Sequence, residues 1–184
     1  DKYNSELIFG IGCPSMDSIG NTYETYLRQG PDKVHPFSLF AGSIHMPTST
    51  ICNELGLRAP STTLSTRCTA GLNAIGSAFH MIRNGKTKMV ITGGFDAPIT
   101  GLLFAAFCRS GLLTTFQGDP AKASRPFDKM RDGGVLSEGA AVIILEELGN
   151  AIRHNRNIYG EIIGFGNTGE HFNNNSDSNG TGPH

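Results

Sequence analysis

The clearest chemistry in this sequence belongs to Cys68, which lies where a short strand should turn into a helix. Residues 62–66 are mostly β-branched, as strands prefer. Beyond the cysteine, four apolar residues recur at the spacing of one helical face: Leu72, Ile75, Phe79 and Ile82. Unpaired backbone N–H groups at a helix start favour a thiolate, and Arg67 would add a cation if its side chain points that way. A strand–turn–helix junction of this kind exposes a nucleophile beside a backbone N–H.

Cys68 also has a simpler interpretation. Free cysteine is among the most buried residue types, so a cysteine before a helix is commonly a packing residue. The local pattern alone does not decide between a nucleophile and a packing residue. The decision rests on motifs elsewhere in the chain.

Three motifs, taken together, carry a family resemblance. Residues 68–76 read Cys-Thr-Ala-Gly-Leu-Asn-Ala-Ile-Gly, residues 93–94 are Gly-Gly, and residues 131–135 read Arg-Asp-Gly-Gly-Val. In order and spacing they resemble the beta-ketoacyl-acyl-carrier-protein synthases. These are condensing enzymes of fatty acid and polyketide synthesis, and they belong to the thiolase superfamily. The resemblance runs from about Ile8 to the last residues.

The resemblance implies an α/β fold of the thiolase-like, layered α/β/α sandwich type. Its sheet would be mixed but mainly parallel, and it would be incomplete in this chain. Residues 1–166 would form part of the N-terminal ketosynthase half. Residues 167–184, rich in Asn, Ser, Gly and Asp, would be a loop or disordered tail leading to a missing C-terminal half. The chain would then be a fragment of a longer protein or a natural partial subunit.

The resemblance also implies an activity, with Cys68 as its nucleophile. Cys68 would accept an acyl group from an acyl carrier protein and then condense it decarboxylatively with malonyl-carrier protein, in fatty acid, polyketide or polyene synthesis. The family's two catalytic histidines and its second oxyanion donor have no matching motif here, so the isolated 184 residues should be inactive. The alternative is a non-catalytic partner of the chain-length-factor type. Such partners typically lack the cysteine, so Cys68 favours the enzyme. A cysteine hydrolase would need a nearby general base, which the sequence does not identify.

Three further positions are implied to shape the acyl pocket. Cys13 matches the position at the far end of the family's pocket, and Phe107 matches a position in its apolar wall. Gly134 stands where the family usually has phenylalanine, which favours a substrate that is bulkier or stiffer near its thioester. Arg67 stands where the family usually has a small residue.

Composition excludes several other classes of protein. A net charge of −1 without a basic stripe argues against nucleic acid as a partner. No apolar run is long enough to span a membrane and no signal peptide opens the chain, so we expect a cytoplasmic location. Four widely spaced cysteines without a C-x-x-C pair indicate neither disulfides nor zinc, and we expect no metal ion and no cofactor. Members of the resembling family dimerise, so we expect a homodimer, or a heterodimer with a homologous ketosynthase chain, with residues 62–66 near the two-fold axis.

Hydrophobic periodicity places the remaining elements around these motifs. Strands are expected over 7–12, 62–66, 88–92, 139–146 and 158–165, with the third ending at the Gly-Gly pair. Helices are expected over 17–28, 46–57 and 147–155, besides the one that follows Cys68. Residues 99–113, apolar on almost every side, should form a buried helix or the wall of a pocket. Connecting loops are expected over 36–41 and 116–134. The longer loop should be organised by four charged residues: Asp128, Arg131, Asp132 and Glu138.

Overall fold

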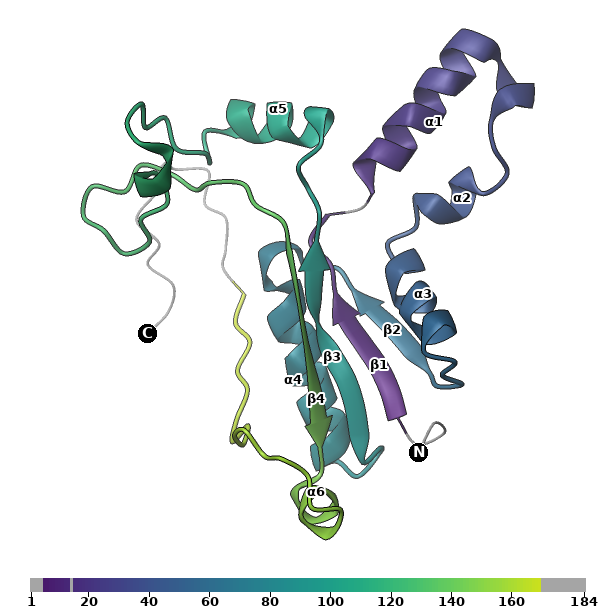
Figure 1. Cartoon of the computed structure of the whole chain (residues 1–184), viewed down its shortest axis with the longest axis vertical. Coiled ribbons are helices and arrows are strands. Elements are labelled where there is room, and N and C mark those ends of the chain that lie inside the picture. Colours follow the sequence, from purple (N-terminus) through teal and green to yellow (C-terminus); the bar gives the residue numbers. More distant parts are fainter. Residues whose placement is uncertain (1–4, 14, 170–184) are drawn as a thin grey trace.

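The computed structural model describes residues 5–13 and 15–169 and is built around a four-stranded sheet (Figure 1). The strands are β1 (Ser5–Gly10), β2 (Ser61–Leu64), β3 (Met89–Asp96) and β4 (Gly139–Glu146), in the order β2-β1-β3-β4. β1 pairs in parallel with both β2 and β3, whereas β4 runs antiparallel to β3. The sheet is therefore mixed and mainly parallel, as the sequence predicted. β2 and β3 are parallel but flank β1 instead of pairing with each other.

The apolar run of β1, residues 7–9, is covered on both faces of the sheet. Leu7 and Phe9 pack on one face with Cys52 from α3 (Met46–Glu54). On the opposite face, Ile8 packs against small side chains of α4 (Ala70–Arg83). Continuous apolar runs are typical of strands buried on both sides. The layers α3, sheet and α4 form the expected α/β/α arrangement (Figure 1).

The other helices lie at the margins of this core. They are α1 (Met16–Gln29), α2 (Ser38–Ala41), α5 (Gly101–Ser110) and α6 (Leu148–Arg153). Short 3₁₀ turns occur at Pro31–Lys33, Arg67–Thr69 and Pro120–Lys122. The prediction of a loop over 36–41 was thus partly wrong, because α2 occupies most of that segment. The long loop over 116–134 is confirmed apart from its single 3₁₀ turn.

Two further expectations about secondary structure were wrong. β3 does not end at Gly93 and Gly94 but continues through them to Asp96. The glycines serve close packing within the strand: Gly93 has φ +148°, and a Cβ there would overlap the carbonyl oxygen of Ala141. Residues 158–165 form no strand, because they have no ladder partner among the described residues. Instead the Phe165 ring covers α4 at Gly76, where a Cβ would overlap it.

α5 is a helix as predicted, but it is not buried. Its apolar side chains include Leu102 and Phe104, which are 60% and 49% exposed. No residue of α5 is buried by the described part of the chain. Packing within residues 5–13 and 15–169 therefore does not explain the apolar composition of α5. The tail expected over 167–184 lies outside the described residues from 170 onwards.

Candidate active site

Cys68 lies on the sharp connection between β2 and α4, as the sequence predicted. The chain leaves β2, makes the Arg67–Thr69 turn and enters α4 directly. Arg67 has φ +58°, a left-handed conformation that is uncommon for a residue with a side chain. Local hydrogen bonds hold the turn: Asn73 Nδ2 donates to Thr66 Oγ1 at 2.8 Å, and Thr69 Oγ1 donates to the Thr66 carbonyl at 2.9 Å. The turn leaves Cys68 exposed.

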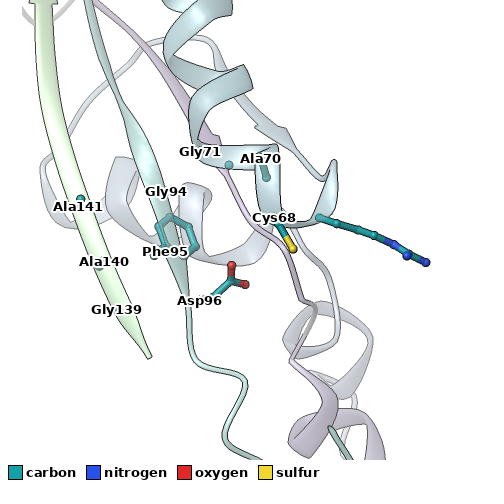
Figure 2. Close-up of a pocket in the computed structure, with 11 residues that line it drawn as sticks. Cys68, Ala70, Gly71, Gly94, Phe95, Asp96, Gly139, Ala140 and Ala141 are labelled. Atoms are coloured by element: carbon teal, nitrogen blue, oxygen red, sulfur yellow. The ribbon is translucent and has the colours of Figure 1, made fainter. Parts of the chain in front are cut away.

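The Cys68 side chain lines a pocket of about 360 Å³ between α4 and the sheet. The elbow, which is the Arg67–Thr69 turn with the start of α4, contributes residues 67, 68, 70 and 71, and β1 contributes Gly10. The rest of the lining comes from the end of β3 and the start of β4: Gly94, Phe95, Asp96, Gly139, Ala140 and Ala141. The pocket therefore opens at the carboxyl ends of the parallel strands β1 and β3, where open α/β sheets usually bind ligands. Figure 2 shows the Cys68 thiol and the Asp96 carboxylate pointing into this space.

Small residues let α4 approach the sheet closely enough to form this pocket. A Cβ at Gly10 would overlap backbone atoms of Ala70 and Gly71. A Cβ at Gly94 would meet the Gly71 Cα at 3.0 Å, which is tighter than almost all real contacts. Backbone packing thus explains the Gly93–Gly94 pair and Gly71, the glycine three positions after the cysteine. They fix where the start of α4 lies above β1 and β3.

Asp96 lines the pocket and was not predicted from the sequence. Its carboxylate accepts hydrogen bonds from the backbone N–H groups of Gly12 and Cys13, the latter at 2.8 Å. Burial raises the pKa of the Cys13 thiol, and the negative charges of Asp96 and of an ionised Cys68 raise it further. The sequence feature that could have indicated Asp96 is its place two positions beyond the Gly-Gly pair, at the end of a predicted strand.

None of the three predicted pocket residues, Cys13, Phe107 and Gly134, is among those that line this pocket. Phe107 lies in α5. Gly134 is bonded to the segment that follows α5: its N–H donates to the Leu112 carbonyl, and its carbonyl accepts from the Thr114 N–H. A Cβ at Gly134 would meet only the Leu112 carbonyl oxygen, at an ordinary 3.7 Å. The backbone therefore does not require glycine at this position.

Asp132 organises the long loop, as the sequence predicted for it. Its carboxylate accepts from Thr114 Oγ1 at 2.5 Å and from the Thr115 N–H at 3.2 Å, and it lies 3.5 Å from Arg125. The hydrogen bond from Thr114 is the main cause that lowers the pKa of Asp132, with help from Thr115 and Arg125. Glu138 ties the loop to the start of α5 by accepting from the Ile99 N–H.

The described part of the chain supplies few other groups to the pocket. None of the histidines within it lines the pocket, so no imidazole base faces Cys68 there. Within the same residues, no three His, Cys, Asp or Glu side chains are grouped so that they could hold a metal ion. None of the helices between residues 5 and 169 that the structure describes has the length and apolar character needed to cross a membrane.

Comparison with known proteins identifies the family of this chain. Residues 6–151 match the family described as "Beta-ketoacyl synthase, N-terminal domain", and the chain belongs to this family. A curated relative from Coxiella burnetii, named 3-oxoacyl-[acyl-carrier-protein] synthase 2, is 40% identical over 161 residues, covering 88% of this chain and 39% of the relative. The chain thus spans well under half of that relative's length.

Solved ketosynthase structures share the fold. The ishigamide ketosynthase/chain length factor matches with a TM-score of 0.74 and 29% identity, over 84% of this chain and 37% of that chain. A type II PKS ketosynthase, solved with its acyl-carrier protein, matches with a TM-score of 0.76 over 86% of this chain and 40% of that chain. At 24% identity the second match shows the fold alone. The fold is therefore thiolase-like, with part of the ketosynthase architecture present in this chain.

Proposed function

We propose that this chain supplies the nucleophile-bearing half of an acyltransferase of the 3-oxoacyl-acyl-carrier-protein synthase type. The observation that carries the proposal is the exposed Cys68 on a strand–helix elbow, above a pocket at the carboxyl ends of β1 and β3. Membership of the beta-ketoacyl synthase family supports the reaction class. The cytoplasmic location expected from the sequence stays a prediction.

The proposed reaction has two halves. In the first, the Cys68 thiolate attacks the carbonyl carbon of an acyl thioester on a carrier protein. The carbon–sulfur bond to the carrier breaks, and the carrier thiol leaves with a proton. In the second, malonyl-carrier protein loses CO₂, and the resulting carbanion attacks the acyl-enzyme. A carbon–carbon bond forms, Cys68 leaves as the thiolate, and the 3-oxoacyl chain stays on the carrier.

Backbone geometry around Cys68 supports the first half-reaction. The residue stands one turn before α4, so its own N–H lies near the positive end of a 14-residue helix. We propose that this N–H is one of two oxyanion donors. A missing oxyanion donor costs about a hundred- to a thousandfold in rate. The isolated 184 residues, which lack the family's histidine motifs, should therefore show no condensation.

The Cys13, Phe107 and Gly134 positions complete the proposal as determinants of the acyl pocket. Cys13 would stand at the far end of that pocket, as the family resemblance implies. A Cβ at Gly134 would make only an ordinary contact, so the backbone tolerates a side chain there. We propose that the glycine leaves open the space that the family's phenylalanine would fill. A phenylalanine buries roughly 150–250 Å². Replacing Gly134 with phenylalanine should therefore slow acylation by bulky acyl groups more than by straight ones.

We propose an acyl carrier protein and a second ketosynthase chain as partners. The curated relatives carry the carrier protein in their names. Among the strands that the structure describes, β2 lies at one edge of the sheet, and none of them pairs with its outer side. An identical or homologous chain that pairs there would remove an exposed edge, which proteins generally protect.

A non-catalytic partner of the chain-length-factor type is the second candidate. The ishigamide assembly shows that this fold occurs in a ketosynthase/chain length factor pair. The presence of Cys68 at the elbow favours the catalytic role.

Mass spectrometry can decide between the two candidates. The protein with its whole natural chain would be incubated with acyl-carrier protein, and its intact mass and peptides measured. The catalytic role predicts one acyl group, on Cys68, in the wild type and none in Cys68→Ala, with Cys108→Ala as the control because Cys108 is also exposed. An unmodified Cys68 in a folded wild-type protein would support the non-catalytic role.

A further inference from the structure

The Cys68 pocket holds a fixed negative charge. Of the described residues that line it, Asp96 is the only acidic one and Arg67 the only basic one. Apart from these two and Cys68, the lining consists of glycine, alanine and Phe95. Figure 2 shows the Asp96 carboxylate and the Cys68 thiol directed into the same space. A group that approaches the Cys68 sulfur therefore also approaches the Asp96 carboxylate.

Two backbone N–H groups hold this carboxylate in place without neutralising it. Oδ1 accepts from the Cys13 N–H at 2.8 Å and from the Gly12 N–H at 3.0 Å, and Oδ2 also lies 3.0 Å from the Gly12 nitrogen. Hydrogen bonds to a carboxylate are about twice as strong as those between neutral groups. None of the ion pairs between side chains that the structure describes involves Asp96. The negative charge is thus fixed in position and has no cationic partner.

The other walls of the pocket offer an anion little to bind. Glycine, alanine and phenylalanine have no side-chain hydrogen-bond donor. An anionic group that enters the pocket would leave water and meet Asp96, with Arg67 as the only cation in the lining. Removing a charge from water without pairing it is costly, whereas an uncharged acyl group does not bear this cost.

We propose that Asp96 is a specificity-determining residue that keeps anionic acyl groups off Cys68, so that the thiol takes uncharged acyl thioesters and rejects dicarboxylic ones such as malonyl and succinyl. This inference rests on the acyl-transfer function proposed above for Cys68 and concerns its first half-reaction. Malonyl-carrier protein would be excluded from the thiol and left for the second half-reaction. The charge of Asp96 carries the effect, and its hydrogen bonds fix where that charge stands.

The expected discrimination follows from the size of the pocket. A roughly spherical space of about 360 Å³ is about 9 Å across, so a carboxylate at its centre lies within about 6 Å of the lining. At that distance, with an effective dielectric constant of about 40 for an open pocket, two like unit charges lower a rate about tenfold. The charge of Arg67 opposes this effect, so Arg67→Gln should widen the discrimination.

Two variants isolate the charge of Asp96. Asp96→Asn removes the charge and keeps a carbonyl oxygen, which can accept the two bonds now made to Oδ1. Asp119→Asn is the matched control, because it makes the same change of charge at a carboxylate that accepts from the Ala121 N–H at 3.1 Å outside the pocket. Thermal unfolding of each variant, made in the protein with its whole natural chain, checks that it is folded.

The first measurement compares alkylation of Cys68 by neutral iodoacetamide and by anionic iodoacetate, read by peptide mass mapping. Cys108 in the same sample is the reference, because it is exposed and does not line the pocket. In the wild type, the preference for iodoacetamide should be about tenfold greater at Cys68 than at Cys108. Asp96→Asn should remove this excess, and Asp119→Asn should keep it. Added salt should narrow the excess in the wild type, because salt screens charge.

The second measurement compares two acyl groups of matched shape, read by intact mass. Succinyl-carrier protein carries a carboxylate, and 4-oxopentanoyl-carrier protein has a methyl group in place of one of its oxygens. Wild-type Cys68 should accept the succinyl group about ten times more slowly, and Asp96→Asn should bring the two rates close together. Asp119→Asn should keep the wild-type ratio.

Several results would overturn the proposal. A wild type that accepts succinyl as fast as 4-oxopentanoyl would do so, and so would a ratio that Asp96→Asn leaves unchanged, even if alkylation changes. A wild-type preference for succinyl that Arg67→Gln abolishes would assign the selectivity to the cation instead. If Asp96→Asn does not fold, a wild-type excess that salt leaves unchanged refutes an electrostatic cause. If wild-type Cys68 accepts neither acyl group, the proposed function fails, and the alkylation ratio alone then decides whether Asp96 excludes anions.

Discussion

Replacing Gly10 with alanine tests how the Cys68 pocket is assembled. The added Cβ would overlap the carbonyl group of Ala70 and the nitrogen of Gly71. All of these are backbone atoms at the start of α4, so no change of side-chain rotamer can relieve the overlap. β1 and α4 must move apart, and Cys68 must move with α4.

The size of the effect follows from the nature of the clash. Overpacking in a core costs about 1–3 kcal/mol, and a backbone clash belongs at the upper end of that range. Because 1 kcal/mol shifts Tm by roughly 2–4 °C in a chain of this size, Tm should fall by about 6–12 °C. A displacement of about 1 Å at a reacting group can cost roughly a hundredfold in rate. Acylation of Cys68 should therefore fall by about that factor.

Thermal unfolding by circular dichroism and acylation of Cys68 by carrier-bound acyl groups measure the two effects. Gly20→Ala is the matched control, because Gly20 lies in α1 and a Cβ there has nothing within 4 Å. Alanine favours a helix over glycine by roughly 0.5–1 kcal/mol, so this control should be as stable as the wild type or more so. A Gly10→Ala protein with the control's Tm and a wild-type acylation rate would refute the packing argument.

Three further predictions concern the rest of the fold. Gly76→Ala should displace the Phe165 ring and make residues 156–169 more sensitive to proteases. In a protein that already carries Phe165→Ala, Gly76→Ala should no longer change the stability. Thr92→Val should leave the free energy of unfolding in urea unchanged or raise it by about 1 kcal/mol, because the Thr92 hydroxyl is buried without a partner among the described residues. Thr48→Val should lower it by about 1 kcal/mol, because the 2.7 Å hydrogen bond between the Thr48 and Thr63 hydroxyls is lost. Because its folded pKa is lowered, Asp132 should stabilise its loop above the ordinary carboxyl pKa and lose that effect as pH falls through the lower folded value. Hydrogen exchange at the Thr115 amide should show this loss in the wild type, and Asp132→Asn should lack the pH dependence.

Much of the fold was predictable because strong local patterns coincide with tertiary packing. The continuous apolar run over 7–12 predicted a buried strand, and β1 is buried on both faces. The spacing after Cys68 predicted a helix, and α4 follows the cysteine within one turn. The acidic side chain of Asp132 organises the long loop, as expected from the polar composition of that segment.

The failures share one cause, which is that pairing and covering depend on distant residues. Residues 158–165 have strand-like composition, but a strand needs a partner, and none is paired with them in the described part of the chain. The apolar sequence of α5 predicted burial, but burial depends on what packs against it. Glycine in a strand was interpreted as a stop, whereas at Gly93 and Gly94 it permits close approach of the neighbouring backbone.

The sequence alone predicted Cys68 as the candidate nucleophile and placed it between a strand and a helix. A thiol after a β-branched run and before a helical face can be found from composition and spacing, because those residues are close in the chain, and the family motifs favour a nucleophile over a packing residue. Only the tertiary structure decided what surrounds it. Asp96 lies 28 positions after Cys68, and its bonds reach back more than 80 positions to Gly12 and Cys13. No local pattern encodes such a contact, because it exists only once β1 and β3 lie side by side and carry both groups to one end of the sheet.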